Sequence, residues 1–189
     1  MVPSQDHKAI FDGDKGPNTG GMGAYSPAPI VTPELEEKVL NTVFKPLVEG
    51  FQKDNINFNG IIYAGLMIDG DTINVVEFNA RFGDPETQVV LPRLENDLVD
   101  IFSAITTKSL DTITLDWNNS SAVCVVLASE GYPQSYQKGN VITGIESFNQ
   151  NTSAPQNTWI IQAGTKQTED NTIVTNGGRV LNVISQADT

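Results

Sequence analysis

Residues 75–88 combine the pattern of a β-strand with an abrupt break and a cluster of oxygen-bearing side chains. Side chains on an extended chain point alternately to opposite faces. Val76 and Phe78 would therefore face a core. Glu77 and Asn79 would lie side by side on the opposite face, before a glycine and a proline end the strand pattern. The stretch thus predicts a carboxylate and a carboxamide presented together at the end of a strand.

The polar side chains of this stretch suit a site for a metal ion and an anion. Glu77 and Asn79 offer hard oxygen ligands of the kind that Mg²⁺ uses together with phosphate oxygens and water. Arg81 carries a planar guanidinium that pairs with a carboxylate or a phosphate. Asp84 and Glu86 fall on the turn that follows. The alternative interpretation is a strand end with a solvated, charged loop.

Four motifs, in the same order along the chain, resemble those of the phosphoribosylamine–glycine ligase family, whose members are ATP-grasp enzymes of purine biosynthesis. The first two are Gln-Asp-His-Lys at 5–8 and Gly-Pro-Asn-Thr-Gly-Gly-Met-Gly-Ala-Tyr-Ser-Pro at 16–27. The others are Glu-Phe-Asn-Ala-Arg-Phe-Gly-Asp-Pro-Glu-Thr-Gln at 77–88 and Thr-Asn-Gly-Gly-Arg-Val at 175–180.

This resemblance implies an ATP-dependent ligation of glycine to 5-phosphoribosylamine through a glycyl phosphate. ATP would be the co-substrate and Mg²⁺ or Mn²⁺ the cofactor. The resemblance also implies roles for individual residues. Catalysis falls on Arg81 and Lys8, metal binding on Glu77 and Asn79, and substrate binding on Asp84, Gly20, Gly21 and Arg179.

Two positions depart from the pattern of the family. Ala9 stands where family members commonly carry an arginine after Lys8. Residues 64–67 hold no acidic side chain, although many ATP-grasp enzymes place a metal ligand on this strand. Any second metal position would therefore depend on Glu77, Asn79 and the nucleotide.

The region from Gly13 to Gly23 is rich in glycine and predicts a loop. Glycines let backbone N–H groups turn toward an anion, or let the chain pass close to a ligand. The loop is neither a Walker A motif nor a Rossmann fingerprint. Composition alone leaves a flexible surface loop and a ligand cradle open, and the resemblance favours the cradle.

Composition excludes several classes of protein. A formal net charge of −12 argues against nucleic acid as a partner, because phosphates are held by basic patches. The only cysteine, Cys124, lies in an apolar run and is expected to be buried; without a disulfide framework the chain suits the cytoplasm. No signal peptide and no apolar run of membrane-spanning length is present, so no membrane partner is expected.

The remaining patterns predict an α+β fold. A helix is expected over 33–52, with Thr32 as N-cap, an apolar stripe facing a core, and Pro46 kinking or dividing it. A hairpin over 60–78, a helix over 89–104 and a boundary in the polar segment 106–119 follow. Beyond the boundary, strands are expected at 121–128, 140–146, 158–164, 171–175 and 178–184.

The predicted organisation is the C-terminal lobe of an ATP-grasp domain at 1–110, followed by a small β-rich C-terminal domain at 111–189. The resemblance implies that the N-terminal half, including the lobe that grips adenine, is missing. The chain is therefore expected to fold but not to turn over alone. Two alternatives remain: another ATP-grasp carboxylate–amine ligase, and a non-catalytic binding or docking fragment.

Overall fold

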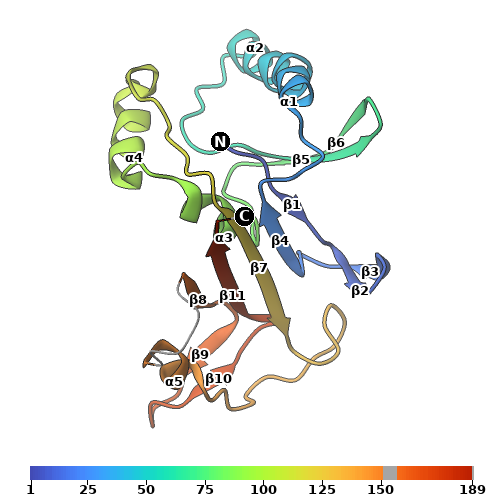
Figure 1. The fold of residues 1–189 in the computed structure, drawn as a ribbon, viewed down its shortest axis with the longest axis vertical. Helices are drawn as coiled ribbons and strands as arrows, with labels where there is room; N and C mark the ends of the chain where they lie inside the picture. Colours follow the sequence, from blue (N-terminus) through green and yellow to red (C-terminus); the bar gives the residue numbers. More distant parts are fainter. Residues whose placement is uncertain (151–156, 189) are drawn as a thin grey trace. The chain divides into compact units, whose positions relative to one another are not determined.

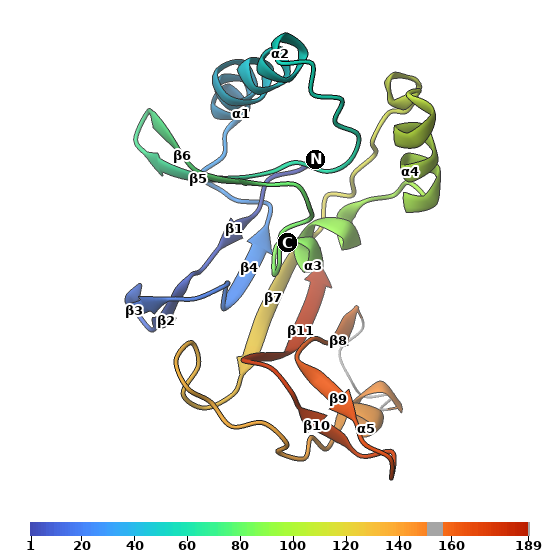
Figure 2. The same ribbon diagram turned by 180° about the vertical axis from the view of Figure 1, so that it is seen from behind.

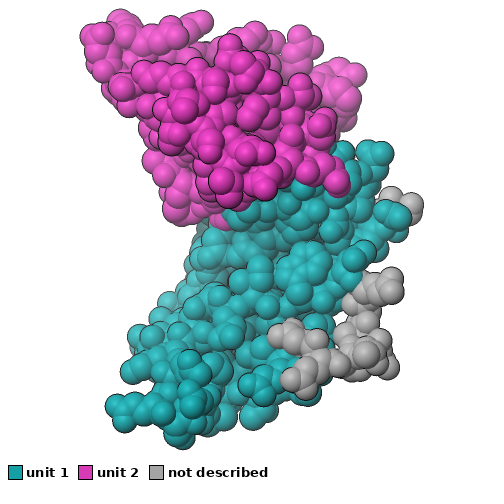
Figure 3. Space-filling view, turned by 90° about the vertical axis from the view of Figure 1, so that its left-hand side faces the viewer, with its two compact units in different colours: residues 1–27, 84–94, 117–189 teal, residues 28–83, 95–116 magenta. Residues whose placement is uncertain are grey.

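The computed structural model describes residues 1–150 and 157–188, which form two compact units (Figure 3). Unit 1 comprises residues 1–27, 84–94 and 117–189, and unit 2 comprises residues 28–83 and 95–116. The units differ from the predicted consecutive division at residue 110. The reason is that strands β1 (Gln5–Asp6) and β4 (Gly23–Ser26) of the N-terminal segment pair into one sheet with β7 (Ser121–Ala128), and the segment 84–94 packs on that sheet.

Unit 1 is built on a five-stranded antiparallel sheet in the order β1-β4-β7-β11-β8 (Figure 1). Its strands are β1 (Gln5–Asp6), β4 (Gly23–Ser26), β7 (Ser121–Ala128), β8 (Thr158–Gln162) and β11 (Arg179–Ala187).

Strand β7 shows why the sheet has one covered face. Ala122, Cys124 and Val126 are buried, whereas the alternate residues along the strand are exposed. The buried side packs with Ala24, Val89, Val90 and Ile184 into one core. Burial raises the pKa of the Cys124 thiol to about 12, with a further contribution from the charge of Asp84. The prediction that this cysteine is a small buried hydrophobe is confirmed.

Shorter elements complete unit 1. They are the hairpin β2 (Ala9–Phe11) and β3 (Lys15–Asn18), the pair β9 (Thr165–Gln167) and β10 (Ile173–Thr175), α3 (Thr87–Val90), the 3₁₀ turn η2 (Leu91–Arg93) and α5 (Ile145–Gln150). The first half of the predicted glycine-rich loop is thus a hairpin.

Two predicted elements of regular structure are wrong. The helix expected over 89–104 is broken, because Pro92 cannot continue an α-helical ladder and Asp97 starts a new helix by accepting a hydrogen bond from the Val99 amide (2.8 Å). The strand expected at 140–146 is reduced to one bridge, between Val141 and Val174.

Unit 2 begins with the predicted helical segment, which is divided into α1 (Pro33–Val39), a π-helical turn η1 (Leu40–Phe44) and α2 (Lys45–Lys53). Thr32 caps it as predicted, with its hydroxyl accepting a hydrogen bond from the Leu35 amide (3.3 Å). The π-turn ends two residues before Pro46, whose missing N–H interrupts the α-helical ladder. The expected core stripe is partly covered: Val43 is buried, Leu35, Val39, Leu47 and Phe51 are half-buried, and Leu40 and Val48 are about half exposed.

The predicted hairpin is confirmed as β5 (Tyr63–Asp69) and β6 (Thr72–Asn79), joined by a two-residue turn and forming a sheet of two strands (Figure 2). Val76 and Phe78 do not enter a core, because 63% and 43% of their surfaces are exposed. A two-stranded ribbon leaves its faces to be covered by other parts of a protein. The prediction that these two side chains are buried is wrong for this chain.

Unit 2 ends with α4 (Leu98–Thr107) and the 3₁₀ turn η3 (Leu110–Thr112). Within the described ranges, no helix is long and apolar enough to cross a membrane.

Candidate functional site

Strand β6 presents Glu77 and Asn79 on one face. Glu77 lies opposite Gly65 and Asn79 lies opposite Tyr63, with the residue between them in unbroken register. The irregularity of the hairpin falls just before this segment, where Leu66 pairs with Val75. The predicted pair of side chains therefore stands on regular strand, where alternation holds.

The surroundings of this pair fit Mg²⁺, which needs few protein ligands, better than they fit a metal ion whose ligands are all protein side chains. The residues of β5 opposite the pair, Tyr63 to Gly65, contribute no carboxylate. The space beside Gly65 is taken by Glu77, since a Cβ on that glycine would lie 3.1 Å from Glu77 Cγ. Among the described residues, no group of three or more His, Cys, Asp or Glu side chains converges to hold a metal ion. Mg²⁺ characteristically combines one or two protein oxygens with substrate phosphates and water.

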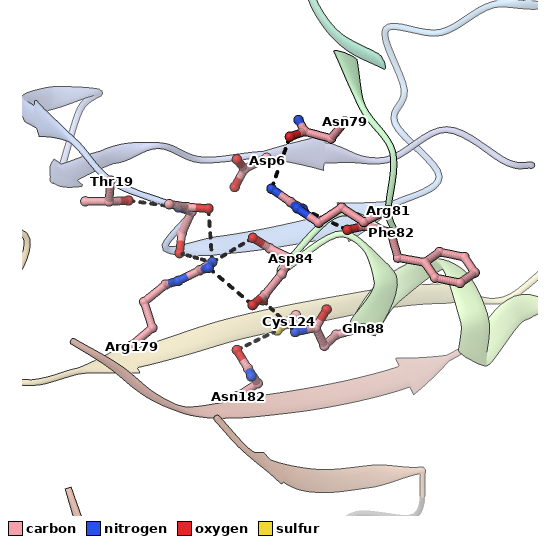
Figure 4. A network of polar contacts seen from close by, with 12 residues as sticks. Asp6, Thr19, Asn79, Arg81, Phe82, Asp84, Gln88, Cys124, Arg179 and Asn182 are labelled. Atoms are coloured by element: carbon pink, nitrogen blue, oxygen red, sulfur yellow. Dashed lines mark hydrogen bonds and ion pairs between the residues drawn. The ribbon is translucent and has the colours of Figure 1, made fainter. Parts of the chain in front are cut away.

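Arg81 lies next to Asn79, as predicted from its spacing (Figure 4). Its Nη2 donates a long hydrogen bond to Asn79 Oδ1 (3.4 Å), and its Nη1 donates to the Phe82 carbonyl (2.8 Å). The Asn79 amide nitrogen is buried and has no hydrogen-bond acceptor. Arg81 is exposed, so its guanidinium remains accessible to an anionic ligand.

In unit 1, Arg179 gathers the predicted substrate-binding residues into one cluster (Figure 4). Its Nη1 donates to the carbonyls of Gly20 (3.0 Å), Gly21 (3.4 Å) and Asp84 (2.6 Å), and its Nη2 donates to Asp84 Oδ2 (3.2 Å). A Cβ on Gly20 would lie 3.0 Å from Arg179 Cζ. Arg179 thus joins three segments that are far apart in sequence, and much of its donor capacity is used within the protein.

The amides of the glycine pair also have partners within the chain. Gly20 donates to the hydroxyl of Tyr132 (3.0 Å), and Gly21 donates to Thr19 Oγ1 (3.0 Å). These N–H groups are therefore not directed at an external anion. The glycines instead allow close approach of protein groups. Sequence reasoning missed Tyr132, because nothing local links it to a loop 112 residues away.

Asp6, which sequence reasoning passed over in favour of Lys8, is a carboxylate of unit 1 with a raised pKa. Its side chain is 8% exposed, and its carboxylate forms an ion pair with Lys8. Burial raises its pKa to about 6, the charge of Glu86 adds to the shift, and the charge of Lys8 opposes it. The motif at residues 5–8 indicated that this segment belongs to the site, but the burial of Asp6 can be seen only in the folded structure.

Lys8 is the cation nearest to this carboxylate. Its Nζ lies 3.8 Å from Asp6 Oδ2, and 42% of its side chain is exposed. Strand β1 and the short hairpin β2–β3 fix the backbone here, since Thr19 donates to the Lys8 carbonyl through both its amide (2.7 Å) and its hydroxyl (2.8 Å). Lys8 is thus anchored by its backbone while its ammonium remains accessible.

Asp6→Asn is expected to stabilise the chain by about 1–2 kcal/mol at pH 7–8 and to give no gain near pH 4. The folded-state pKa of Asp6 is about 6 against an ordinary 3.8, so the folded chain binds more protons between these values. Stability contributed by this group therefore falls as pH rises through that window. Urea unfolding at both pH values, with the exposed Asp12→Asn as control, measures the difference. A stabilisation that is equal at pH 4 and pH 8 would contradict the assignment.

Comparison with known proteins places these residues in one family. Residues 1–87 match the family model for the phosphoribosylglycinamide synthetase ATP-grasp (A) domain, and residues 122–189 match the model for the C domain of the same synthetase. A phosphoribosylamine–glycine ligase of Neisseria meningitidis is 47% identical over 189 residues, and one of Halalkalibacterium halodurans is 48% identical over 191 residues. These alignments cover all of this chain but 43% and 42% of the relatives.

A solved structure agrees with the sequence comparison. The crystal structure of phosphoribosylamine–glycine ligase from Thermotoga maritima superposes with a TM-score of 0.75 at 32% identity, over 98% of this chain and 44% of that one. A long-chain acyl-CoA carboxylase shares the fold at a TM-score of 0.58 and 13% identity. The chain spans less than half the length of the relatives it matches.

Proposed function

Because the chain belongs to the phosphoribosylglycinamide synthetase family, we propose that it forms the metal-holding and substrate-positioning part of an ATP-dependent ligase. The reaction joins glycine to 5-phosphoribosylamine. ATP phosphorylates the glycine carboxylate, and the amine of phosphoribosylamine then attacks the carbonyl carbon and expels phosphate. The remaining part of the ligase supplies the lobe that holds adenine. With a single cysteine, which is buried, we assign the enzyme to the cytoplasm.

The observation that carries this proposal is the placement of Glu77 and Asn79 side by side on regular strand. Their two oxygens would hold Mg²⁺ or Mn²⁺ in company with nucleotide phosphates. A bound ion supplies neutralisation of phosphate charge during transfer. Arg81, beside the pair, is suited to bind the oxygens of the transferring phosphoryl group.

The cluster in unit 1 would position the other substrate groups. Lys8 offers an accessible ammonium for phosphate oxygens. Asp84 is held by Arg179, and the same guanidinium fixes the Gly20–Gly21 segment. We therefore assign Arg179 to positioning Asp84 and the Gly20–Gly21 segment. Asp84 and this glycine segment would then contact the substrate.

The test is reconstitution. We define the chimera as this chain joined to the remaining part of the Neisseria meningitidis relative. The chimera should release ADP only when glycine and phosphoribosylamine are both present. The 189-residue chain alone should release none and should bind Mg-ATP with a Kd on the order of millimolar or weaker, because it lacks a wall for adenine.

The two alternative functions give different results in the same assay. Another carboxylate–amine ligase would release ADP with a carboxylate other than glycine. A docking fragment would leave the folded chimera inactive with every substrate. Glycine-dependent ADP release by the 189-residue chain itself would show that it carries a nucleotide site of its own.

A further inference from the structure

Tyr132 holds one side of the Gly20–Gly21 segment through its hydroxyl. The Gly20 amide donates to the Tyr132 hydroxyl (3.0 Å), and the Gly20 carbonyl accepts from Arg179 Nη1 (3.0 Å). These bonds fix the peptide units on either side of Gly20, a residue type whose backbone is otherwise free to adopt many conformations. Two side chains from distant parts of the sequence therefore determine the course of this exposed glycine.

Gly178 links Tyr132 to Arg179. The Tyr132 ring lies so close to Gly178, the residue before Arg179, that a Cβ on that glycine would overlap the ring. Gly178 is buried, and its carbonyl accepts a hydrogen bond from the Ser129 amide (2.7 Å). All of these residues belong to unit 1. The two side chains that hold Gly20 are thus placed relative to each other within one unit.

The loop that carries Tyr132 is held by further contacts. Ser129 Oγ donates to the Gly177 carbonyl (2.9 Å), and the Tyr132 amide donates to the Ser129 carbonyl (3.1 Å). The ring of Tyr132 meets that of Tyr136 edge to face, with 6.1 Å between their centroids. Both the backbone and a neighbouring ring therefore place Tyr132, so that its hydroxyl is directed at Gly20 before any ligand binds.

We propose that Tyr132 is a positioning residue for substrate binding, whose hydroxyl fixes the Gly20–Gly21 segment in the conformation that contacts substrate. This assignment rests on the proposed function, in which that segment and Asp84 make the contact. The hydroxyl acts through the segment and not on the substrate itself. Because a segment that is already ordered loses less entropy when a ligand binds, the bond should favour binding more than the chemical step.

A purely structural role for Tyr132 predicts a different result. The hydrogen bond from Gly20 is exposed, and a neutral, exposed hydrogen bond contributes little to the stability of the whole chain. Its removal should therefore leave the free energy of unfolding nearly unchanged while it loosens Gly20 locally. If Tyr132 served the fold alone, its hydroxyl would matter for unfolding and not for substrate binding.

The first measurement is amide hydrogen exchange of the 189-residue chain by NMR. Tyr132→Phe keeps the ring and removes only the hydroxyl, so exchange of the Gly20 amide should become about fivefold faster, as expected for the loss of one ordinary hydrogen bond. The Gly21 amide, which donates to Thr19 Oγ1, should change less. The matched control Tyr136→Phe removes the same group from the neighbouring ring and should change neither rate. Urea unfolding of both variants measures their stability.

Kinetics of the chimera give the functional measurement. In an active chimera, Tyr132→Phe should raise KM about three- to fivefold for at least one of the two substrates other than ATP. It should leave kcat and KM for ATP within about twofold. Tyr136→Phe should leave all of these constants within about twofold.

The outcomes separate this inference from the proposed function. Unchanged exchange of the Gly20 amide in Tyr132→Phe overturns the inference. Faster exchange with every KM unaltered in an active chimera also overturns it, and leaves the ligase assignment intact. A loss of stability as large as that of Arg179→Met would identify a structural role instead. A chimera that releases no ADP overturns the ligase assignment, and the exchange rates then decide whether Tyr132 fixes the segment.

Discussion

Glu77→Ala is expected to lower kcat of the chimera about 100- to 1,000-fold, which corresponds to about 3–4 kcal/mol of lost transition-state stabilisation. The reason is that Glu77 and Asn79 are the paired oxygen ligands of strand β6, and the residues of β5 opposite them, Tyr63 to Gly65, include no carboxylate to replace either. KM for glycine should change little, because the pair is assigned to the metal ion and not to the amino acid. Steady-state rates of ADP release across a range of Mg²⁺ concentrations measure the effect.

The matched control for this variant is Glu37→Ala, which removes an exposed glutamate from helix α1 in the same unit. It should leave kcat within about twofold, as expected for a surface substitution. If Glu77→Ala also stays within a few-fold of the parent at every Mg²⁺ concentration, Glu77 is not a metal ligand.

Arg179→Met is expected to destabilise the chain by about 2–3 kcal/mol, because it removes charge-assisted hydrogen bonds to several carbonyls and leaves Asp84 without its ion pair. Methionine keeps much of the length of the side chain, so the loss reports on the guanidinium more than on packing. Urea unfolding gives the free energy, and hydrogen exchange of the Gly20 and Gly21 amides should become faster.

Arg81→Met serves as the control for stability. Arg81 is exposed, and its hydrogen bonds to Asn79 and Phe82 stay within two positions of itself, so its replacement should cost less than about 0.5 kcal/mol. Equal destabilisation by the two variants would contradict the view that Arg179 joins distant segments.

The sequence predicts elements of the fold well where a local pattern determines them. Thr32 and Pro33 mark a helix start by their own chemistry, and the turn after Asp69 marks a hairpin. It predicts burial poorly where the covering partner is remote. Val76 and Phe78 have the alternation of a strand facing a core, but their exposure depends on what packs against them.

The residues of the candidate site also fall into a group that the sequence predicts and a group that it does not. Glu77, Asn79 and Arg81 are close in sequence, so strand alternation is sufficient to bring them together. The cluster around Arg179 depends on contacts across 159 residues, and Tyr132 reaches Gly20 across 112. The burial of Asp6 is a property of its surroundings in three dimensions, and no local pattern in the sequence reports it.

The hairpin that carries Glu77 and Asn79 has a consequence for handling the protein. It is a sheet of two strands, so each strand has one unpaired edge, and its apolar side chains Val75, Val76, Phe78 and Met67 are exposed. Unpaired edges with exposed apolar residues promote aggregation by pairing with other chains. The net charge of −12 opposes this by mutual repulsion, and salt screens that repulsion. The tendency of the 189-residue chain to aggregate should therefore increase with ionic strength.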